Sequence, residues 1–119
     1  MNIEDLRNFC LSLKEAKEGL PFDNKTLVVS VKGKMFCATD VEDYELINVK
    51  CEPEEAILLR EKYEDVIPGY YMNKKHWNSI RTDGKISDKL LKEWVKKSYD
   101  LVVAGLPKKT QKELKEEKK

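Results

Sequence analysis

Two short apolar runs separated by a Lys-Gly-Lys turn most constrain what this chain can fold into. Residues 26–31 are apolar and β-branched, residues 35–39 are again mostly apolar, and Gly33 lies at the centre of the connection between them. Strand-forming runs joined by so short a glycine-containing connection form a tight β-hairpin. The middle of the chain therefore predicts an antiparallel sheet.

Further extended segments follow this hairpin. After an acidic turn at residues 40–43, residues 46–49 predict a third antiparallel strand that ends near Lys50. Residues 66–72 and 76–81 have extended character as well, and the second of these ends at the turn-forming pair Asp83 and Gly84. The loop at residues 19–24 precedes the hairpin, and we expect its Phe22 to fold back into the core.

Three helices are predicted from their starts and their apolar spacing. Asn2 is a suitable N-cap for a helix at about residues 3–15, and Pro53 suits the first turn of a second helix. Ser87 caps a third helix, which Gly105 ends. Its buried stripe is expected to comprise Leu90, Leu91, Trp94, Val95, Ser98, Leu101 and Val102.

The resulting order is α-β-β-β-α-β-β-α, followed by a short basic C-terminal helix or tail. This order predicts an α+β fold in which one antiparallel sheet carries helices mainly on one face. Residues 1–106 are expected to form one domain and residues 107–119 the helix or tail. Because Leu114 is the one sizeable apolar residue after Lys108, we expect that end to be solvated and frayed.

Composition and cysteine spacing predict a protein of the reducing cytoplasm. The chain is 40% hydrophobic and 38% charged, without an apolar run near the roughly 20 residues that a membrane span needs. Cys10, Cys37 and Cys51 are odd in number and far apart, which favours buried free thiols over disulfides. A zinc site formed by the three cysteines and His76 is conceivable, but the close ligand pairs typical of such sites are missing.

The sequence contains no motif that indicates an enzyme. A single histidine and isolated glycines provide neither a nucleophile and base pair nor a phosphate-binding loop. A Cys–His dyad that uses His76 remains an alternative, with core packing as the simpler explanation of each cysteine. We therefore expect a non-enzymatic protein without a metal or a cofactor.

Charge is distributed unevenly along the chain. Residues 1–69 carry 9 Lys or Arg against 15 Asp or Glu, whereas residues 70–119 carry 14 against 7. Within the basic part, residues 70–81 read YYMNKKHWNSIR and mix cations with aromatic rings. Cations neutralise phosphates and exposed rings stack on bases, so this pattern is typical of nucleic-acid binding. The candidate DNA-binding residues are Lys74, Lys75, His76, Arg81 and Lys85.

Each of these residues also has a structural interpretation. Strand alternation could turn Trp77 into the core and leave the lysines as ordinary solvated charges. His76 could contact phosphate, or it could hydrogen-bond the backbone where the chain enters the strand. The lysines of the third helix, Lys89, Lys92, Lys96 and Lys97, could serve only solubility.

Five segments in order give the chain a family resemblance: LPF at residues 20–22, GKMF at 33–36, KCEPEEA at 50–56, PGYYMNKKHW at 68–77 and SYDLVVAGLPKK at 98–109. The chain resembles, over its full length, the MmcQ/YjbR family, small bacterial proteins labelled DNA-binding. The resemblance implies a fold similar to frataxin-like and secretion-chaperone-like domains, and DNA binding through a double-wing arrangement. It implies no catalytic or metal-binding residues.

Two functional hypotheses follow. The first is weak, non-specific binding of duplex DNA through the basic segment. The second is a protein-interaction or chaperone-like adaptor without a nucleic-acid role, which would use an exposed sheet face or edge. A coherent positive surface in the folded domain favours DNA, and an apolar patch favours a protein partner.

Overall fold

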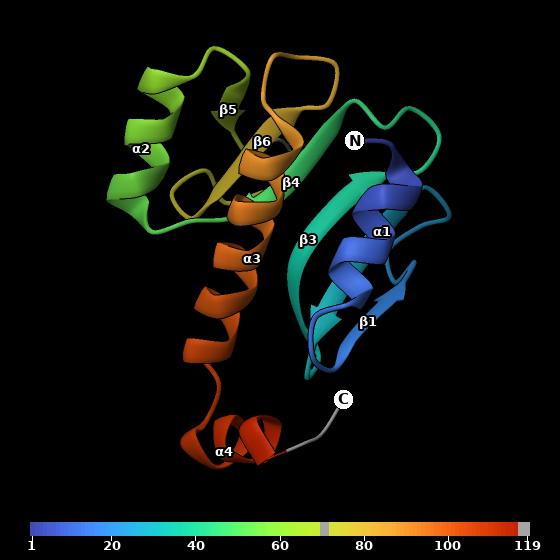
Figure 1. The fold of residues 1–119 in the computed structure, drawn as a ribbon, viewed down its shortest axis with the longest axis vertical. Coiled ribbons are helices and arrows are strands. Elements are labelled where there is room, and N and C mark those ends of the chain that lie inside the picture. Colours follow the sequence, from blue (N-terminus) through green and yellow to red (C-terminus); the bar gives the residue numbers. More distant parts are fainter. Residues whose placement is uncertain (70–71, 117–119) are drawn as a thin grey trace.

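The computed structural model of the chain describes residues 1–69 and 72–116, and its elements follow the predicted order with one additional strand. Figure 1 labels these elements. The helices and strands are α1 (Ile3–Leu11), β1 (Ala16–Gly19), β2 (Thr26–Val31), β3 (Lys34–Asp40), β4 (Leu46–Lys50), α2 (Pro53–Lys62), β5 (Val66–Pro68), β6 (Trp77–Arg81), α3 (Asp88–Ala104) and α4 (Lys108–Glu116).

The six strands form one antiparallel sheet in the order β1-β2-β3-β4-β6-β5. The predicted hairpin is β2 and β3, whose two central turn residues, Lys32 and Gly33, both have positive φ angles. Positive φ at both positions matches the right-handed twist of the flanking strands, and glycine adopts it without strain. The pairing of β2 with β3 shifts between Val29 and Ser30, where Phe36 is the additional residue of a β-bulge.

The helices lie over one face of this sheet. Helix α3 packs across β3 and β4, α1 lies beside β1, and α2 covers β5 and β6 (Figure 1). None of the helices formed by the described residues lies on the opposite face, which we call the uncovered face. The α+β architecture with helices on one face is therefore confirmed. No helix among residues 1–69 and 72–116 is long and apolar enough to cross a membrane.

The core lies between the sheet and α3. The strands contribute alternate residues to it, among them Val29, Cys37, Val49 and Ile80, and α3 contributes its apolar stripe. From that stripe the buried residues are Leu91, Trp94, Val95, Ser98, Tyr99 and Val102. Leu90 and Leu101, which the sequence also assigned to the stripe, are only partly buried.

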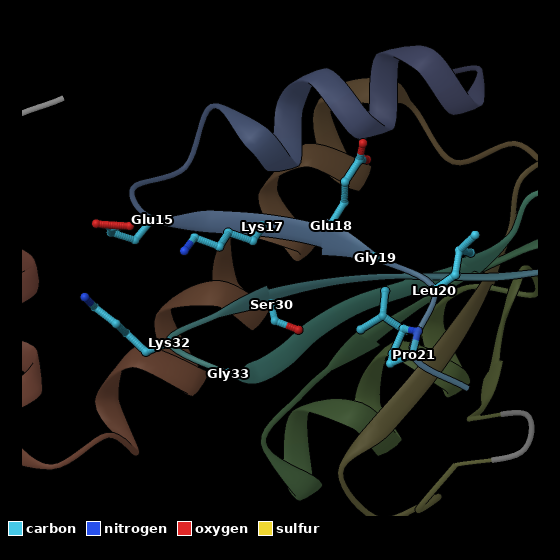
Figure 2. Close-up of a pocket in the computed structure, with 10 residues that line it drawn as sticks. Glu15, Lys17, Glu18, Gly19, Leu20, Pro21, Ser30, Lys32 and Gly33 are labelled. Atoms are coloured by element: carbon cyan, nitrogen blue, oxygen red, sulfur yellow. The ribbon is translucent and has the colours of Figure 1, made fainter. Parts of the chain in front are cut away.

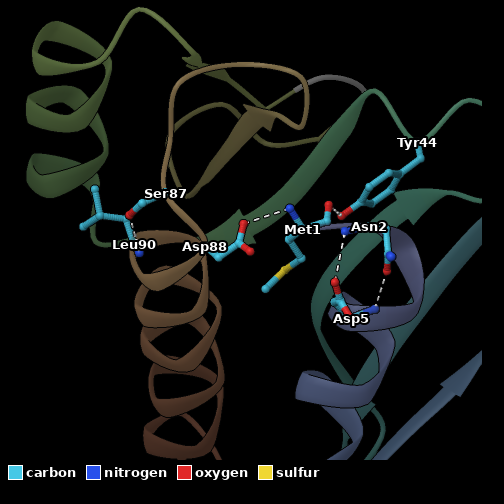
Figure 3. Close-up of polar contacts among 7 residues, drawn as sticks. All are labelled: Met1, Asn2, Asp5, Tyr44, Ser87, Asp88 and Leu90. Atoms are coloured by element: carbon cyan, nitrogen blue, oxygen red, sulfur yellow. Dashed lines mark hydrogen bonds and ion pairs between the residues drawn. The ribbon is translucent and has the colours of Figure 1, made fainter.

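Caps at the helix starts agree with the sequence and connect distant parts of the chain (Figure 3). The Asn2 side chain accepts from the Asp5 amide at 2.8 Å, and Ser87 accepts from the Leu90 amide at 3.2 Å. The amino group of Met1 lies 2.8 Å from the Asp88 carboxylate, and the Tyr44 hydroxyl donates to the Met1 carbonyl at 3.0 Å. The start of the chain is thus attached to both α3 and the sheet.

Three expectations about the N-terminal region need correction. Helix α1 ends at Leu11 and not near Glu15. Ser12 is its C-cap, the Leu13 amide donates to the Cys10 carbonyl only three residues back, and the positive φ angle of Glu15 lies outside helical geometry. Strand β1 was not predicted; it pairs with β2, and its Glu18 accepts two hydrogen bonds from Arg7 of α1, at 2.6 and 2.8 Å. Phe22 does not return to the core, since it is 71% exposed.

The expectation of a frayed C-terminal end is wrong for residues 108–116. They form helix α4, whose single sizeable apolar side chain, Leu114, is 4% exposed and belongs to the core cluster. The carbonyl of Lys115 also accepts from the Lys14 ammonium at 3.1 Å. One apolar contact at the correct helical position therefore attaches this charged helix to the domain.

Trp94 provides a test of the core. Its ring is 5% exposed and packs edge-on against Tyr63, with the ring centroids 5.2 Å apart. Trp94→Ala should lower the free energy of unfolding by about 3–5 kcal/mol because it leaves a large cavity. Urea denaturation measures the change, and a loss below about 1 kcal/mol would contradict the packing described here.

Leu114 tests the attachment of α4. Leu114→Ala should lower the free energy of unfolding by about 2–4 kcal/mol, the usual range for a buried leucine. Leu58→Ala is the matched control, because Leu58 is 62% exposed on α2 and its removal should cost less than about 0.5 kcal/mol. Equal, small effects of the two substitutions would mean that α4 does not dock.

Candidate nucleic-acid interface

The predicted basic residues occupy two places in the structure. Lys74 and Lys75 are exposed in the loop before β6, and His76 is partly exposed next to them. Arg81 is the last residue of β6 and Lys85 follows in the next turn. Because a strand rises about 3.3 Å per residue, Trp77 and Arg81 at the two ends of β6 are roughly 13 Å apart. The five residues therefore form two groups at opposite ends of β6.

Residues 73–76, which we call the cationic loop, are held in place by several hydrogen bonds. The Asn73 side chain accepts from the Lys75 amide at 2.9 Å, and the Asn73 carbonyl accepts from the Trp77 amide at 3.0 Å. The His76 carbonyl accepts from the Cys51 amide at 2.7 Å. The loop is thereby fixed to the sheet at its base while both lysine side chains point away from a defined backbone.

Arg60 of α2 attaches the same loop from the other side. Its Nε donates to the Asn78 side chain at 2.7 Å, and its guanidinium also donates to the Lys74 carbonyl. Asn78 is 1% exposed and in turn donates to the Ala56 carbonyl of α2 at 3.2 Å. Sequence reasoning missed Arg60, because nothing in the helical segment PEEAILLREK indicates that its guanidinium will reach a loop fourteen residues later.

The structure decides between the two interpretations of Trp77. Alternation along β6 turns Asn78 and Ile80 toward the helices, so Trp77 faces the other way. It is partly exposed, it is not a member of the core cluster, and Gly69 packs tightly against its Cβ. An aromatic surface therefore lies next to the cationic loop. Tyr70 and Tyr71 of the same segment lie outside the described residues.

The charges of Lys74 and Lys75 are also available to an anionic ligand. Neither forms an ion pair with any residue in the described part of the chain. On α3, two of the four lysines are paired, Lys96 with Asp100 at 2.6 Å and Lys97 with Glu55 of α2 at 3.0 Å. Unpaired exposed cations exchange water for phosphate at lower cost than paired ones, so the loop is the better anion site.

Arg81 and Lys85 lie in a more acidic environment. Asp65 accepts from the Lys85 amide through its carboxylate at 2.8 Å and from the Arg81 amide through its backbone carbonyl at 2.9 Å. Gly84 lies so close to this carboxylate that a Cβ there would overlap it. With Asp83 in the same turn, the positive charge here is largely balanced.

The three cysteines are free thiols and all are buried. Cys10 and Cys37 lie in contact in the core, where their mutual hydrogen bond and burial raise the pKa of Cys37 well above its usual range. Burial, together with the nearby Glu55 carboxylate, raises the pKa of Cys51 to about 11. Among residues 1–69 and 72–116, no three His, Cys, Asp or Glu side chains are grouped closely enough to hold a metal ion.

The fold and this loop define a class: a small α+β protein with a single antiparallel sheet and a preorganised cationic loop at one end of a central strand. A family model described as YjbR matches residues 11–101. The chain belongs to the YjbR family.

Relatives cover nearly the whole chain. The uncharacterized protein YbdF of Escherichia coli O157:H7 is 34% identical over 110 residues, which are 92% of this chain and 90% of YbdF. The uncharacterized protein YjbR of Escherichia coli strain K12 is 32% identical over 108 residues, 90% of this chain and 92% of YjbR.

Solved structures agree with the architecture. Protein DR2400 of Deinococcus radiodurans superposes with a TM-score of 0.89 at 38% identity, covering 95% of this chain and 87% of DR2400. A protein from Pseudomonas syringae superposes with a TM-score of 0.72 at 21% identity, covering 85% of this chain and 98% of that protein. The second likeness shows the fold alone.

The Cys51 thiol gives a testable pH dependence. Its pKa of about 11 in the folded protein lies above the ordinary value of 9.0, so the unfolded chain loses this proton first as the pH rises. The contribution of Cys51 to the free energy of unfolding should therefore be constant up to about pH 8.5 and fall as the pH rises toward 11, in addition to any contribution from the raised pKa of Cys37 and Tyr44.

Cys51→Ala should reduce this alkaline decline, and denaturation midpoints measured between pH 8 and about 10.5 will show it. A midpoint that rises with pH, or a decline of the same size in the variant, would contradict the assignment to Cys51.

Proposed function

We propose that this protein binds nucleic acid without catalysis, through the cationic loop at residues 73–76. The observation that carries the proposal is the combination of two unpaired, exposed lysines with a backbone that is already fixed. Lys74 and Lys75 have no ion partner among the described residues, and Asn73, Arg60 and the strand pairing hold the loop that presents them.

The adjacent groups suit the same ligand. Trp77 offers part of an aromatic face next to the lysines, and His76 lies between them, partly exposed. Stacking on an aromatic ring stabilises an unpaired base, whereas lysine ammonium groups contact phosphates of any sequence. The proposed binding is therefore weak and independent of sequence, in keeping with a net charge of only +1.

The proposal is narrower than the one that the sequence suggested. Arg81 ends β6 and Lys85 follows it, both beside Asp65 and at the opposite end of the strand from the cationic loop, so they are not expected to contact the same phosphates. Two lysines are expected to contact about two phosphates. The logarithm of the association constant for duplex DNA should then fall with the logarithm of the salt concentration at a slope of roughly −2, because each neutralised phosphate contributes about −0.9.

Fluorescence anisotropy with labelled random duplexes at several salt concentrations tests this. Replacing Lys74 and Lys75 by Glu should abolish measurable binding at about 50 mM salt and tens of micromolar protein, with thermal stability nearly unchanged, because surface substitutions usually cost little. The matched control replaces Arg81 and Lys85 by Glu. This control changes the net charge equally and should retain most of the affinity.

Two results would defeat the proposal. One is an absence of binding by the parent protein under these conditions. The other is an equal loss of affinity in the two charge-reversed variants, which would indicate a general charge effect in place of a site. In either case the adaptor hypothesis without a nucleic-acid role would be preferred.

A further inference from the structure

The uncovered face of the sheet contains a hollow of about 550 Å³, and residues 73–76 are not part of its described lining. Its floor is formed by Ala38 of β3 and by Leu46 and Asn48 of β4, and Phe22 and Met72 contribute to its lining from two loops. Its size falls within the range of roughly 300–1,000 Å³ typical of binding sites. The surface between these two loops is therefore concave and partly apolar. We call it the acidic hollow, because four carboxylates belong to its lining.

Exposed apolar side chains are concentrated near this hollow. Phe22 is 71% exposed, Leu20 is 49% exposed, and Val41, whose amide donates to the Lys25 carbonyl, is 38% exposed. The remaining large exposed apolar residues of the described chain, Ile57 and Leu58, lie on α2. An exposed apolar cluster around a concave surface is typical of an interaction site.

The exposure of Phe22 is built into a fixed turn. The Asp23 carboxylate accepts from the amides of Lys25 and Thr26 at 2.9 and 2.7 Å, which defines the turn that carries Phe22. These hydrogen bonds also lower the pKa of Asp23, so its charge is retained. The ring therefore faces solvent on an ordered backbone.

The rim of the hollow is negatively charged. Asp23, Asp40, Asp43 and Glu45 surround it, and Lys25, the one cation among the described residues of its lining, pairs with Glu42 at 3.4 Å. Asp23 and Asp40 also have structural roles as acceptors of backbone amides, whereas Asp43 and Glu45 are exposed. This charge repels phosphate and attracts cationic side chains.

A second hollow on the same face extends the surface. It has a volume of about 480 Å³ and is lined by Leu20, Pro21, Val28 and Ser30 (Figure 2). Its charged lining is mixed, because it contains Lys17 and Lys32 together with Glu15 and Glu18. Two hollows in succession across one sheet face form an elongated surface. That shape suits an extended polypeptide better than a single small molecule.

We propose that the uncovered face docks an extended segment of a partner protein, one that combines an apolar side chain with lysine or arginine. The apolar side chain packs against Phe22 and Met72 over Ala38 and Leu46, and the cations lie at the carboxylates of the rim. This docking does not rest on the proposed function, because the described lining of the hollow contains none of residues 73–76 and carries the opposite charge, although Met72 brings the hollow next to the cationic loop.

Phage display of random dodecapeptides against the full chain, followed by anisotropy with the selected peptides, tests the docking. Selected peptides should contain apolar residues together with Lys or Arg. Phe22→Ala should weaken their binding by about tenfold or more, as expected for a central aromatic contact. The matched control, Leu58→Ala, removes a similarly exposed apolar side chain outside the hollow and should change the affinity less than about twofold.

A second pair of variants tests the charge. Replacing Asp43 and Glu45 by Lys should weaken the binding of the selected peptides by about tenfold or more. Replacing Glu61 and Glu64 of the α2 region by Lys should have little effect on that binding. Lys74→Glu with Lys75→Glu should leave peptide binding unchanged, and Phe22→Ala should leave DNA binding unchanged. The docking and the nucleic-acid proposal can therefore fail separately.

Three outcomes would overturn the docking: no selected peptide binding better than about 1 mM, selected peptides without basic residues, or equal binding by the Phe22→Ala and Leu58→Ala variants. Because Phe22 and Leu58 are both largely exposed, neither variant is expected to affect folding. Circular dichroism of each variant confirms this before binding is measured.

Discussion

The two hydrogen bonds of the Ser98 hydroxyl are the interactions on which the packing of α3 against the sheet depends. This hydroxyl is fully buried, donates to the Phe36 carbonyl at 2.5 Å and accepts from the Lys50 amide at 2.8 Å. The Phe36 carbonyl is at the β-bulge and the Lys50 amide is at the end of β4, and both residues lie just outside the paired part of β3 and β4, so Ser98 provides the partner that this pairing does not. An unsatisfied buried backbone group costs about 1–3 kcal/mol. Ser98 thus fixes where α3 crosses β3 and β4.

This attachment determines which surfaces remain for binding. With α3 across the centre of the sheet and α1 and α2 at its sides, no described helix covers the opposite face (Figure 1), although Val28 and Ala38 on that face are themselves buried. The acidic hollow occupies that face, and its carboxylates come from the acidic first part of the chain. The cationic loop comes from the basic second part and is held by α2 through Arg60. The charge asymmetry of the sequence is therefore retained as two separate surfaces.

Local signals made most of the fold predictable. The hairpin at Gly33, the cap at Ser87 and the burial of Trp94 each follow from a few neighbouring residues. Strand β1 could not be predicted, because the sequence AKEG has no apolar alternation and forms a strand only by pairing with β2. Phe22 and Leu114 were misassigned because an apolar side chain alone does not indicate whether the fold provides a place for it.

The candidate site was predictable only in part. Residues 73–76 are adjacent in sequence and remain adjacent in the structure, so Lys74, Lys75 and His76 stayed together. Arg81 and Lys85 were separated from them by the length of an extended strand, a distance that composition does not reveal. The contribution of Arg60 depends on tertiary packing of α2 against β6.

The proposed function requires that the cationic loop is the surface that binds nucleic acid. The most direct measurement is an NMR titration of the ¹⁵N-labelled protein with a random-sequence duplex, followed through the backbone amides. If the cationic loop binds the duplex, the largest changes in amide chemical shift should occur at Lys74, Lys75, His76 and Trp77. Smaller changes are expected at Arg81, at Lys85 and in the acidic hollow. Shifts centred on Arg81 and Lys85 or on α3, or none at saturating DNA, would contradict the proposed function.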